Sequence, residues 1–334
     1  MLCIKVPVKQ AEKVKKDLMN KGLFDKEHYI KKDQGFVYFP VKKKFKTKHP
    51  ILHKILKKKK PRPDLKASLT KKLSKKGLEF LRTSMDVIGN IAILEIPEEL
   101  EKKEKLIAQE VLKANKNIKT VLKKGKHGGT FRTQELKHLA GEKTKEAECK
   151  ENNVTLKLDV EKVYFSPRLS NDRKRIGKLI KKPEEVLVMF SGASPYVCVI
   201  AKNTKAKYVT GVEINPEAHN YALQNVITNK LNNTSVFLGD VKNIVPKLNK
   251  KFDRILMPLP KTASEYLDVA LKAAKKGAVI HFYDFQNEDE TEKSVEKIKK
   301  ACKKAKKKCR ILKIVKCGQH APREFRFCVE FKVL

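Results

Sequence analysis

The sequence predicts an α/β fold in which a doubly wound C-terminal domain follows two smaller α+β domains. From about residue 163 onward, apolar runs of strand length alternate with segments of helical periodicity. The run 186–189 leads into a turn of small residues, and the next run, 207–212, closes on Glu213, 21 residues after Gly192. In doubly wound sheets an acid at this spacing binds the ribose hydroxyls of a nucleotide-like ligand. The alternative is an ordinary buried strand pair that ends in Glu.

Size and charge narrow the class of protein. A chain of 334 residues with 40% hydrophobic content can bury a sizeable core in two or three domains. Its formal net charge of +39 exceeds what solubility requires and predicts a polyanionic partner, most simply nucleic acid. An anionic membrane is the competing partner, but no 18-residue apolar stretch or signal-peptide core is present. Because lysine is scattered along the chain, a compositional habit of the source organism is an alternative explanation for part of the charge.

The cysteines indicate the redox compartment. Their number is odd and no two form a C-x-x-C pair, which favours reduced thiols in a cytoplasmic protein over a disulfide framework or a zinc site. We therefore expect no metal. The seven positions are Cys3, Cys149, Cys198, Cys302, Cys309, Cys317 and Cys328.

The first predicted domain, residues 1–62, is a small basic α/β module. It should contain a strand over 2–6, a helix over 10–20 and short strands around Tyr29 and over 36–40. The stretch 41–60 then has ten lysines and no acid before Pro61-Arg-Pro63 breaks any helix. This stretch is predicted to be a basic linker or a phosphate-facing edge, with a solvated tether as the alternative.

The second predicted domain spans residues 63–163 and is also α+β. It should contain strands over 91–96, 118–122, 128–142 and 154–159 and an amphipathic helix over 98–113. Basic residues alternate along these half-buried strands, as on an RNA-facing sheet. Any solvated sheet shows the same alternation.

The third predicted domain, residues 164–334, alternates strand and helix and ends in two strands that pair as a hairpin. This order is that of a Rossmann-like class I methyltransferase. The lysines of its last helix belong to the solvated face, because apolar residues occupy the other face at helical spacing. Strands are expected at 186–189, 207–212, 234–238, 254–257, 277–283, 311–316 and 325–333, and helices at 172–181, 195–203, 216–229, 262–274 and 288–308.

Seven motifs carry a family resemblance over essentially the whole chain. They are FRTQELKHLAGE at 131–142, YFSPRLSNDRKRI at 164–176, MFSGASPY at 189–196, EINP at 213–216, GDV at 239–241, LMPLPK at 256–261 and APRE at 321–324. In this order they resemble the archaeal and eukaryotic tRNA (guanine-37-N1) methyltransferase family. The N-terminal module is similar to the domain with which that family docks on the outer corner of tRNA.

The resemblance implies S-adenosylmethionine as the cofactor. Glu213 would hold the ribose hydroxyls, and Asp240 the adenine amino group with the Val241 backbone beside it. Arg173 would lie near the methionine carboxylate. For Asp240 there is an alternative role, that of a helix N-cap. The other cofactor positions that the resemblance implies are Phe190, Gly192, Pro195, Ile214, Asn215 and Pro258.

The resemblance also implies the acceptor side of the reaction. N1 of guanine carries a proton that must leave, and charge that develops on O6 must be stabilised. These roles fall on Asp172 as base and Arg132 near O6, with Tyr164 as an orienting partner. Asp172 has the alternative role of a helix N-terminal acid, and Arg132 that of a phosphate contact. The positions implied to contact tRNA are Arg168, Lys261, Arg323, Lys42, Lys43 and Lys44.

Some positions depart from the family pattern, and three functions remain open. Asp172 is one methylene shorter than the usual Glu, Val188 replaces an acid, Ser194 a glycine and Pro258 an asparagine.

The expected function is methylation of guanosine 37 in tRNA by a cytoplasmic monomer. The alternatives are a wyosine-pathway enzyme that transfers methyl or aminocarboxypropyl to a tricyclic base, and an inactive tRNA-binding homologue.

Overall fold

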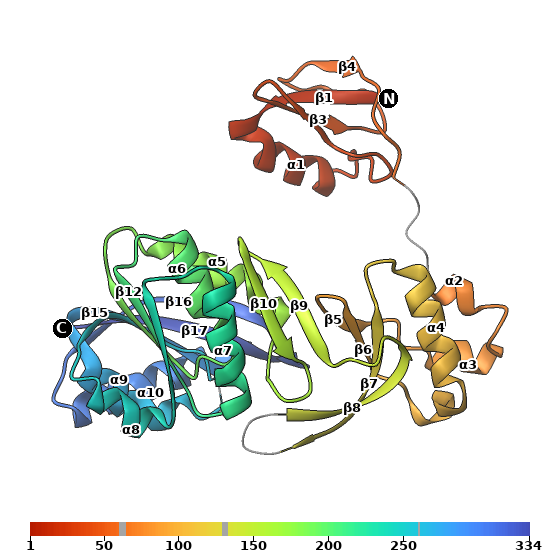
Figure 1. Cartoon of the computed structure of the whole chain (residues 1–334). Coiled ribbons are helices and arrows are strands. Elements are labelled where there is room, and N and C mark those ends of the chain that lie inside the picture. Colours follow the sequence, from red (N-terminus) through yellow and green to blue (C-terminus); the bar gives the residue numbers. More distant parts are fainter. Residues whose placement is uncertain (60–64, 129–132, 260) are drawn as a thin grey trace. The chain divides into compact units, whose positions relative to one another are not determined.

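The computed structural model describes residues 1–59, 65–128, 133–259 and 261–334. The chain divides into two compact units, Met1–Ala67 and Ser68–Leu334 (Figure 1). Within the described residues, no helix combines the length and apolar character needed to cross a membrane.

The first unit contains a four-stranded antiparallel sheet, on which helix α1 (Ala11–Asn20) packs. The strand order is β2-β3-β1-β4, and Leu18 of the helix packs with Ile4, Val37 and Phe39 in the core. The amphipathic pattern of residues 11–20 explains why this segment forms a helix: one side of the helix faces the sheet, and the other side carries lysines. The elements are β1 (Leu2–Pro7), α1 (Ala11–Asn20), β2 (Lys31–Asp33), β3 (Phe36–Pro40) and β4 (Ile51–His53).

Strand β4 corrects the prediction for the lysine-rich stretch 41–60. Strand β4 pairs with β1, with Ile51 opposite Ile4. Lys54, the first residue after the strand, donates from Nζ to the Asp33 carboxylate at 3.1 Å. The tether interpretation is therefore wrong for this part of the stretch, because it belongs to the sheet. The strand expected around Tyr29 begins only at Lys31.

The second unit begins with helices and a mixed four-stranded sheet in the order β5-β6-β7-β8. Helix α4 packs on β7 and β8, and the predicted helix over 98–113 is divided, since its first turns, Glu98–Lys103, are 3₁₀-helical. The elements are α2 (Leu65–Leu69), α3 (Lys75–Phe80), β5 (Met85–Ile88), β6 (Ile91–Leu94), α4 (Glu104–Ala114), β7 (Thr120–Gly128) and β8 (Thr133–Gly141).

A hairpin of β9 (Glu146–Glu151) and β10 (Val154–Asp159) connects this sheet to the C-terminal domain. The open edge of β10 is paired by side chains of helix α7 (Pro216–Thr228). Asn225 Oδ1 accepts from the Lys157 N–H at 2.7 Å and its Nδ2 donates to the Lys157 carbonyl at 3.0 Å. Asn229 does the same for Thr155. These amides satisfy backbone groups that an edge strand would otherwise expose.

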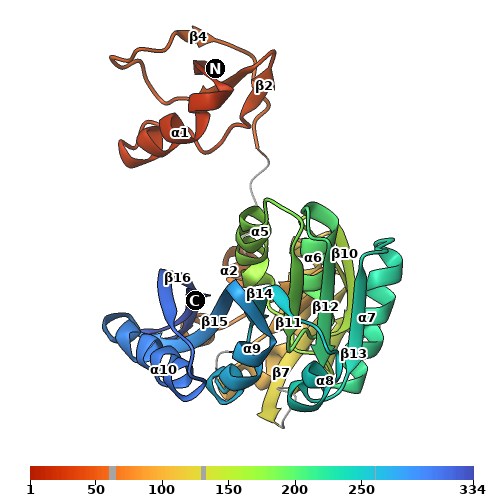
Figure 2. The ribbon, with the colours of Figure 1, turned by 90° about the vertical axis from the view of Figure 1, so that its left-hand side faces the viewer.

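The C-terminal domain contains a seven-stranded sheet in the order β13-β12-β11-β14-β15-β17-β16. β11 to β15 are parallel, and β17 and β16 add antiparallel strands, which confirms the predicted Rossmann-like class and its terminal hairpin. α6 and α7 cover one face, and α8, α9 and α10 cover the other (Figure 2). The strands are β11 (Glu185–Met189), β12 (Tyr208–Glu213), β13 (Thr234–Leu238), β14 (Phe252–Met257), β15 (Ala274–Asn287), β16 (Cys309–Ala321) and β17 (Glu324–Val333).

The helices follow the predicted order with one addition. Helix α8 is absent from the predicted order of elements, although the N-cap alternative for Asp240 implies a helix at this point. It is short and contains Pro246, a residue that normally argues against a helix interior. The predicted helix over 262–274 begins with a 3₁₀ turn. The helices are α5 (Ser170–Leu179), α6 (Pro195–Asn203), α8 (Val241–Lys247), α9 (Leu267–Ala273) and α10 (Thr291–Lys304).

A chain of buried charged groups crosses the centre of the sheet. Arg254 donates from Nε to Glu184 at 2.7 Å, and its Nη1 contacts His281 Nε2 at 2.6 Å. His281 Nε2 therefore acts as an acceptor, and its Nδ1 faces Glu330 at 3.7 Å. Glu330 also accepts from Arg175. Burial would raise the pKa of Glu330, but the neighbouring His281 and Arg175 side chains lower it to about 2, whereas burial lowers the pKa of His281.

Both shifts predict loss of stability in acid. His281 stays neutral in the fold, so stability is lost as the pH falls below its ordinary pKa of 6.5, where the unfolded chain binds protons. The contribution of Glu330 is complete above 4.5 and is lost as the pH falls toward about 2. We expect the urea midpoint of unfolding to fall steadily from neutral pH through this window, and less steeply in Glu330→Gln. Equal slopes in the two proteins would contradict this assignment.

Candidate active site

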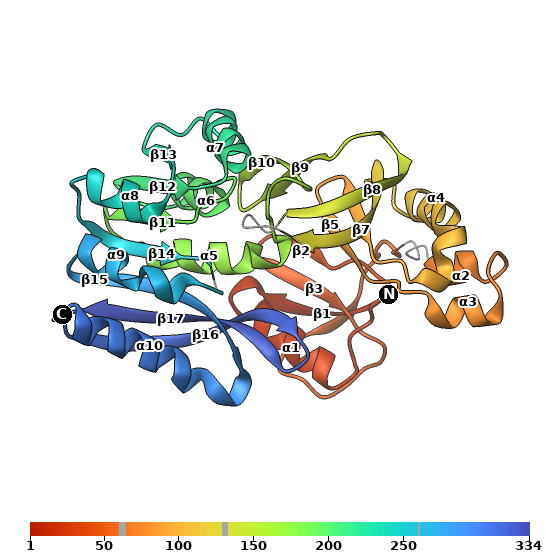
Figure 3. The same ribbon diagram turned by 90° about the horizontal axis from the view of Figure 1, so that it is seen from below.

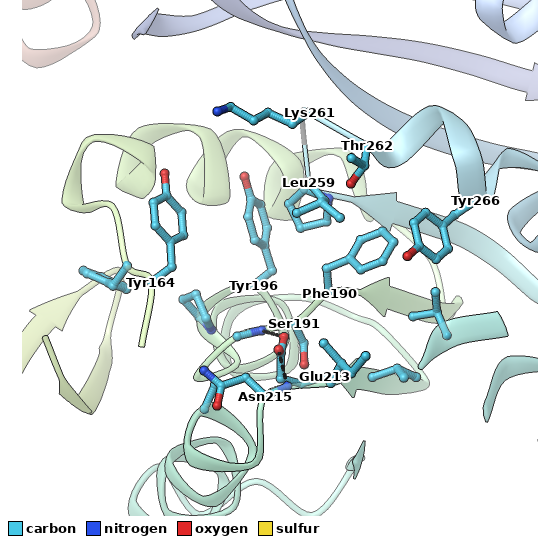
Figure 4. A pocket seen from close by; sticks show the side chains of 18 of the residues that line it. Tyr164, Phe190, Ser191, Tyr196, Glu213, Asn215, Leu259, Lys261, Thr262 and Tyr266 are labelled. Atoms are coloured by element: carbon cyan, nitrogen blue, oxygen red, sulfur yellow. Dashed lines mark hydrogen bonds between the residues drawn. The ribbon is translucent and has the colours of Figure 1, made fainter. Parts of the chain in front are cut away.

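A cavity of about 550 Å³ lies at the carboxyl ends of the parallel strands. β12 and β13 extend the sheet to one side of β11 and β14 to the other, so the strand order reverses between β11 and β14. Ligands of open α/β sheets bind at this switch point. The lining includes Tyr164, Phe190, Gly192, Tyr196, Glu213, Ile214, Asp240, Leu259, Lys261 and Tyr266, most of them labelled in Figure 4.

The loop after β11 has left-handed backbone at three residues. Phe190, Gly192 and Ser194 have φ values of 56°, 58° and 61°. A non-glycine residue in this region costs about 1–3 kcal/mol, so the surrounding structure must hold the turn. The Ser191 N–H donates to the Val212 carbonyl at 2.9 Å, and Ser194 is fully buried. Ser194, which stands where the family pattern has a glycine, thus adopts the left-handed backbone that glycine favours.

Glu213 is fixed by two backbone donors at the tip of β12. Its Oε2 accepts from the Gly192 N–H at 2.6 Å and its Oε1 from the Asn215 N–H at 2.9 Å. Burial raises the pKa of Glu213 because the charged carboxylate is desolvated. Figure 4 shows this carboxylate at the cavity between the loop and Asn215. A rigid acceptor of this kind suits a pair of hydroxyl groups.

Asp240 lies at the tip of the neighbouring strand and caps α8. Its Oδ1 accepts from the Lys242 N–H at 2.8 Å, so the N-cap alternative correctly describes what this oxygen does. A carboxylate has a second oxygen, so capping and ligand binding are compatible. Ile214 and Val241 add apolar surface to the same part of the lining. The acids and apolar side chains together fit a nucleoside-like group.

The other predicted cofactor residues surround this part of the cavity. Phe190 packs edge-on against Tyr266, with ring centroids 4.9 Å apart. Arg173 lines the cavity but is only 1% exposed, because it is paired with Glu151 and donates to the Ser166 carbonyl at 3.2 Å. The lining also contains Pro195, Asn215 and Pro258.

Asp172 does not belong to the cavity lining and is enclosed behind it. Its carboxylate accepts from the hydroxyls of Tyr196, at 2.7 Å, and Tyr283, and from Arg175 Nε at 2.8 Å. Cys317 Sγ lies 3.4 Å away. Burial acts to raise the pKa of Asp172, but these donors outweigh burial and the pKa is lowered. Tyr196 both lines the cavity and contacts this carboxylate.

The predicted acceptor and tRNA residues are more dispersed. Tyr164 and Lys261 line the cavity, and Tyr164 accepts from Arg326 Nη2 at 3.1 Å. Arg168 forms an exposed ion pair with Asp86. Arg132 lies outside the described residues. The remaining positions are exposed: Arg323 in the turn between β16 and β17, and Lys42, Lys43 and Lys44 in the first unit.

Several lining residues were missed by sequence reasoning. Tyr196 follows the predicted loop directly, so its place at the first turn of α6 was a usable signal. Glu265 and Tyr266 follow the Met-Pro-Leu-Pro turn after β14, in a 3₁₀ segment that was predicted only as helix. Tyr283 reaches Asp172 from 111 residues away, and no local pattern indicates such a contact.

One buried group of the described residues has metal-ligand chemistry. Ligand atoms of His281, Cys328 and Glu330 lie within 4.8 Å of one another. However, Arg254 contacts the His281 ring and Arg175 contacts Glu330. Two guanidinium groups repel a further cation, so this group is an ion-pair network.

Three family models match successive parts of the chain. They are the tRNA methyltransferase 5 N-terminal domain over residues 3–48, the TYW2 N-terminal domain over 65–144, and the TRM5/TYW2 methyltransferase domain over 147–312.

Two archaeal relatives span nearly the whole chain, and both are named tRNA (guanine(37)-N(1))-methyltransferase Trm5b. The one from Pyrococcus abyssi is 39% identical over 99% of both chains. The one from Methanocaldococcus jannaschii is 32% identical over 99% of this chain and 98% of its own. Shorter relatives include a Methanocaldococcus jannaschii tRNA(Phe) (4-demethylwyosine(37)-C(7)) aminocarboxypropyltransferase, 30% identical over 73% of this chain and 96% of its own.

Solved structures agree with these matches. Trm5b from Pyrococcus abyssi superposes with a TM-score of 0.75 at 38% identity, covering 100% of this chain and 99% of that one. A complex of aTrm5 with tRNALeu gives a TM-score of 0.71 at 31% identity, over 99% of both chains. Methanocaldococcus jannaschii TYW2 in complex with AdoMet gives 0.58 at 25% identity, over 75% of this chain and 99% of that one. The chain thus belongs to the TRM5/TYW2 methyltransferase family, as its motifs predicted.

Proposed function

We propose that the protein transfers a methyl group from S-adenosylmethionine to N1 of guanosine 37 in tRNA. The observation that carries this proposal is the cavity at the switch point, with Glu213 and Asp240 at adjacent strand tips. Full-length relatives with the same domain order are named for this reaction. The aminocarboxypropyltransferase relative covers less of the chain, which favours methyl transfer to guanosine.

The described residues suit the cofactor. When bound, S-adenosylmethionine supplies a methyl group on a positively charged sulfur, which is displaced in line by the acceptor nitrogen. Glu213 would hold the ribose hydroxyls and Asp240 would accept from the adenine amino group, with Ile214 and Val241 as the apolar part of the same lining. Gly192 leaves room at the loop, because a Cβ there would meet only the Tyr164 carbonyl, at 3.8 Å. Arg173 would lie near the methionine carboxylate, with its guanidinium held in place by Glu151.

Removal of the N1 proton is assigned to Asp172 acting through Tyr196. As the new N–C bond forms, the proton leaves N1 for the Tyr196 oxygen while the Tyr196 hydroxyl proton passes to Asp172. The hydrogen bond of 2.7 Å between Tyr196 and Asp172 supports this path, and so does the position of Asp172 behind the lining. The path removes the difficulty that Asp172 is one methylene shorter than Glu, because the carboxylate need not reach N1.

The substrate is assigned from charge as well as from relatives. The net charge of +39 fits an RNA partner, and the exposed lysines 42–44 supply a cluster for phosphates. Arg323 and Lys261 are proposed to contact the anticodon loop. A target base in a loop can be turned out into a pocket, which fits RNA better than duplex DNA.

Neutralising Lys42, Lys43 and Lys44 together to Gln should weaken tRNA binding at low salt. The slope of log K against log salt should become shallower by about 0.7–0.9 for each phosphate that the variant no longer neutralises. The matched control changes three exposed lysines on α10, Lys299, Lys300 and Lys303, to Gln. If both triple variants show the same slope as the parent, the first unit does not bind phosphate through these lysines.

The function is tested with two tRNA transcripts that differ only at position 37. Incubation with methyl-labelled S-adenosylmethionine should label the transcript with guanosine 37 and leave the one with adenosine 37 unlabelled. Label in neither transcript, under conditions in which tRNA binds, would support an inactive homologue.

A further inference from the structure

Three side chains at the end of the C-terminal hairpin form a stacked row. The rings of Phe285 and His320 are nearly parallel, at 17°, with centroids 4.0 Å apart. The Arg326 guanidinium lies over the same Phe285 ring, with its central carbon 5.3 Å from the centroid. We call His320, Phe285 and Arg326 the stacked row. Figure 3 shows the three strands that carry it, β15, β17 and β16, side by side.

Strand register explains why these residues meet. Phe285 on β15 pairs directly with Arg326 on β17, and Arg326 pairs with Gly318 on β16. Directly paired residues point to the same face of a sheet. Gly318 has no side chain, and a Cβ built there would have no atom within 4 Å. The sheet surface beside Arg326 is therefore open where a third side chain would normally stand.

The row leads to the rim of the cavity. Arg326 Nη2 donates to the Tyr164 hydroxyl at 3.1 Å. Tyr164 lines the cavity and is 45% exposed, which is high for a large aromatic residue. A continuous path of flat side chains thus extends from the hairpin to the lining of the cavity.

The surroundings of the row favour an anionic ligand with flat groups. The exposed Arg323 is in the adjoining turn, and the row itself contains the Arg326 guanidinium. Glu324 lies 3.7 Å from His320 and offsets only part of this positive charge. Aromatic rings and guanidinium planes are the surfaces on which proteins stack unpaired RNA bases.

We propose that the stacked row is a platform for one unpaired nucleotide that directly adjoins the target base in the tRNA loop. When the target base turns out into the cavity, its neighbour loses a stacking partner, and the row replaces that partner. The platform also fixes the loop relative to Tyr164. The inference rests on the proposed tRNA substrate, to which it adds a second base contact.

The test uses His320→Ala and Phe285→Leu in the full-length chain. His320 is exposed, and leucine keeps the apolar volume of Phe285 while it removes the flat ring. Phe325→Leu is the matched control, because Phe325 is a partly buried aromatic residue of the same hairpin whose ring is covered by Lys316, 3.3 Å from the centroid. Phe325 follows Glu324 and precedes Arg326, so its side chain points to the opposite face of the sheet.

The readout is tRNA with 2-aminopurine at the position before or after nucleotide 37. At one of these positions, the parent and Phe325→Leu should quench the fluorescence of 2-aminopurine, and the two row variants should leave it bright. The KM for tRNA should rise about tenfold in the row variants, since one base–aromatic stack is removed. Equal fluorescence in the row variants and the parent at both positions would overturn the platform. Labelling of guanosine 37 by the parent is measured in the same samples, so failure of the proposed function is recognised separately.

Discussion

Glu213→Ala is expected to raise the Kd for S-adenosylmethionine by about 100-fold or more. A carboxylate that accepts from both ribose hydroxyls makes two charge-assisted hydrogen bonds, each worth about 1.5–3 kcal/mol. Loss of about 3 kcal/mol corresponds to a factor of about 100 in affinity. The alanine also leaves the Gly192 and Asn215 amides without their acceptor. Isothermal titration with the cofactor measures the change.

Two further variants separate the ligand contact from support of the loop. Glu213→Gln retains one carbonyl oxygen for a backbone amide and should reduce the affinity about tenfold, since only the charge and one acceptor are gone. Glu217→Gln is the control, because Glu217 is an exposed acid four residues along the chain that pairs with Lys162 at 3.5 Å. An unchanged Kd in Glu213→Ala would exclude the assigned cofactor orientation.

Asp172→Asn is expected to lower kcat by about 100-fold or more and to leave the Kd for tRNA nearly unchanged. General bases typically contribute factors of about 10²–10⁴, and an amide cannot accept the proton. Because the pKa of Asp172 is lowered, its ionised form persists down to pH values below 3.8, and the rate should not fall through about pH 5 on its account. Single-turnover methyl transfer measures the effect.

The two tyrosines that contact Asp172 provide a matched pair. Tyr196→Phe removes the hydroxyl of the residue that also lines the cavity, and Tyr283→Phe removes an equivalent contact from a residue outside the lining. If Tyr196 relays the proton, Tyr196→Phe should lose most of the rate and Tyr283→Phe little. Equal effects of the two would mean that both only hold Asp172, and an unchanged rate in Asp172→Asn would remove it as the base.

The cofactor end of the site was predictable because it depends on local sequence. Glu213 ends β12, Asp240 follows the end of β13 by two residues, and Gly192 lies in the turn between strand and helix. Parallel pairing alone therefore brings them to one edge. The order of strands and helices in the C-terminal domain was also predictable, because the alternation of strand and helix patterns is a local property of the sequence. Strand β9 escaped prediction because its sequence, EAECKE, is mostly charged and its partner is the adjacent hairpin strand.

The acceptor end was less predictable because it depends on distant contacts. Its motif places Asp172 in the first turn of α5, but the sequence does not indicate that Tyr283 on β15 and Cys317 on β16 enclose it. Strand β4 was missed for a related reason. The apolar run that contains Ile51 is short and lies between lysines, and the residue with which Ile51 pairs, Ile4, is far away in the chain.

Methylation of guanosine 37 at N1 is the central claim, and nucleoside mass spectrometry tests it directly. A tRNA transcript with guanosine 37 is incubated with S-adenosylmethionine that carries distinct isotopes in the methyl and the aminocarboxypropyl groups, and is then digested to nucleosides. We predict N1-methylguanosine with the methyl isotope only, absent in Asp172→Asn at matched times. A product with the aminocarboxypropyl isotope, or methylation only when a tricyclic base occupies position 37, would contradict the claim.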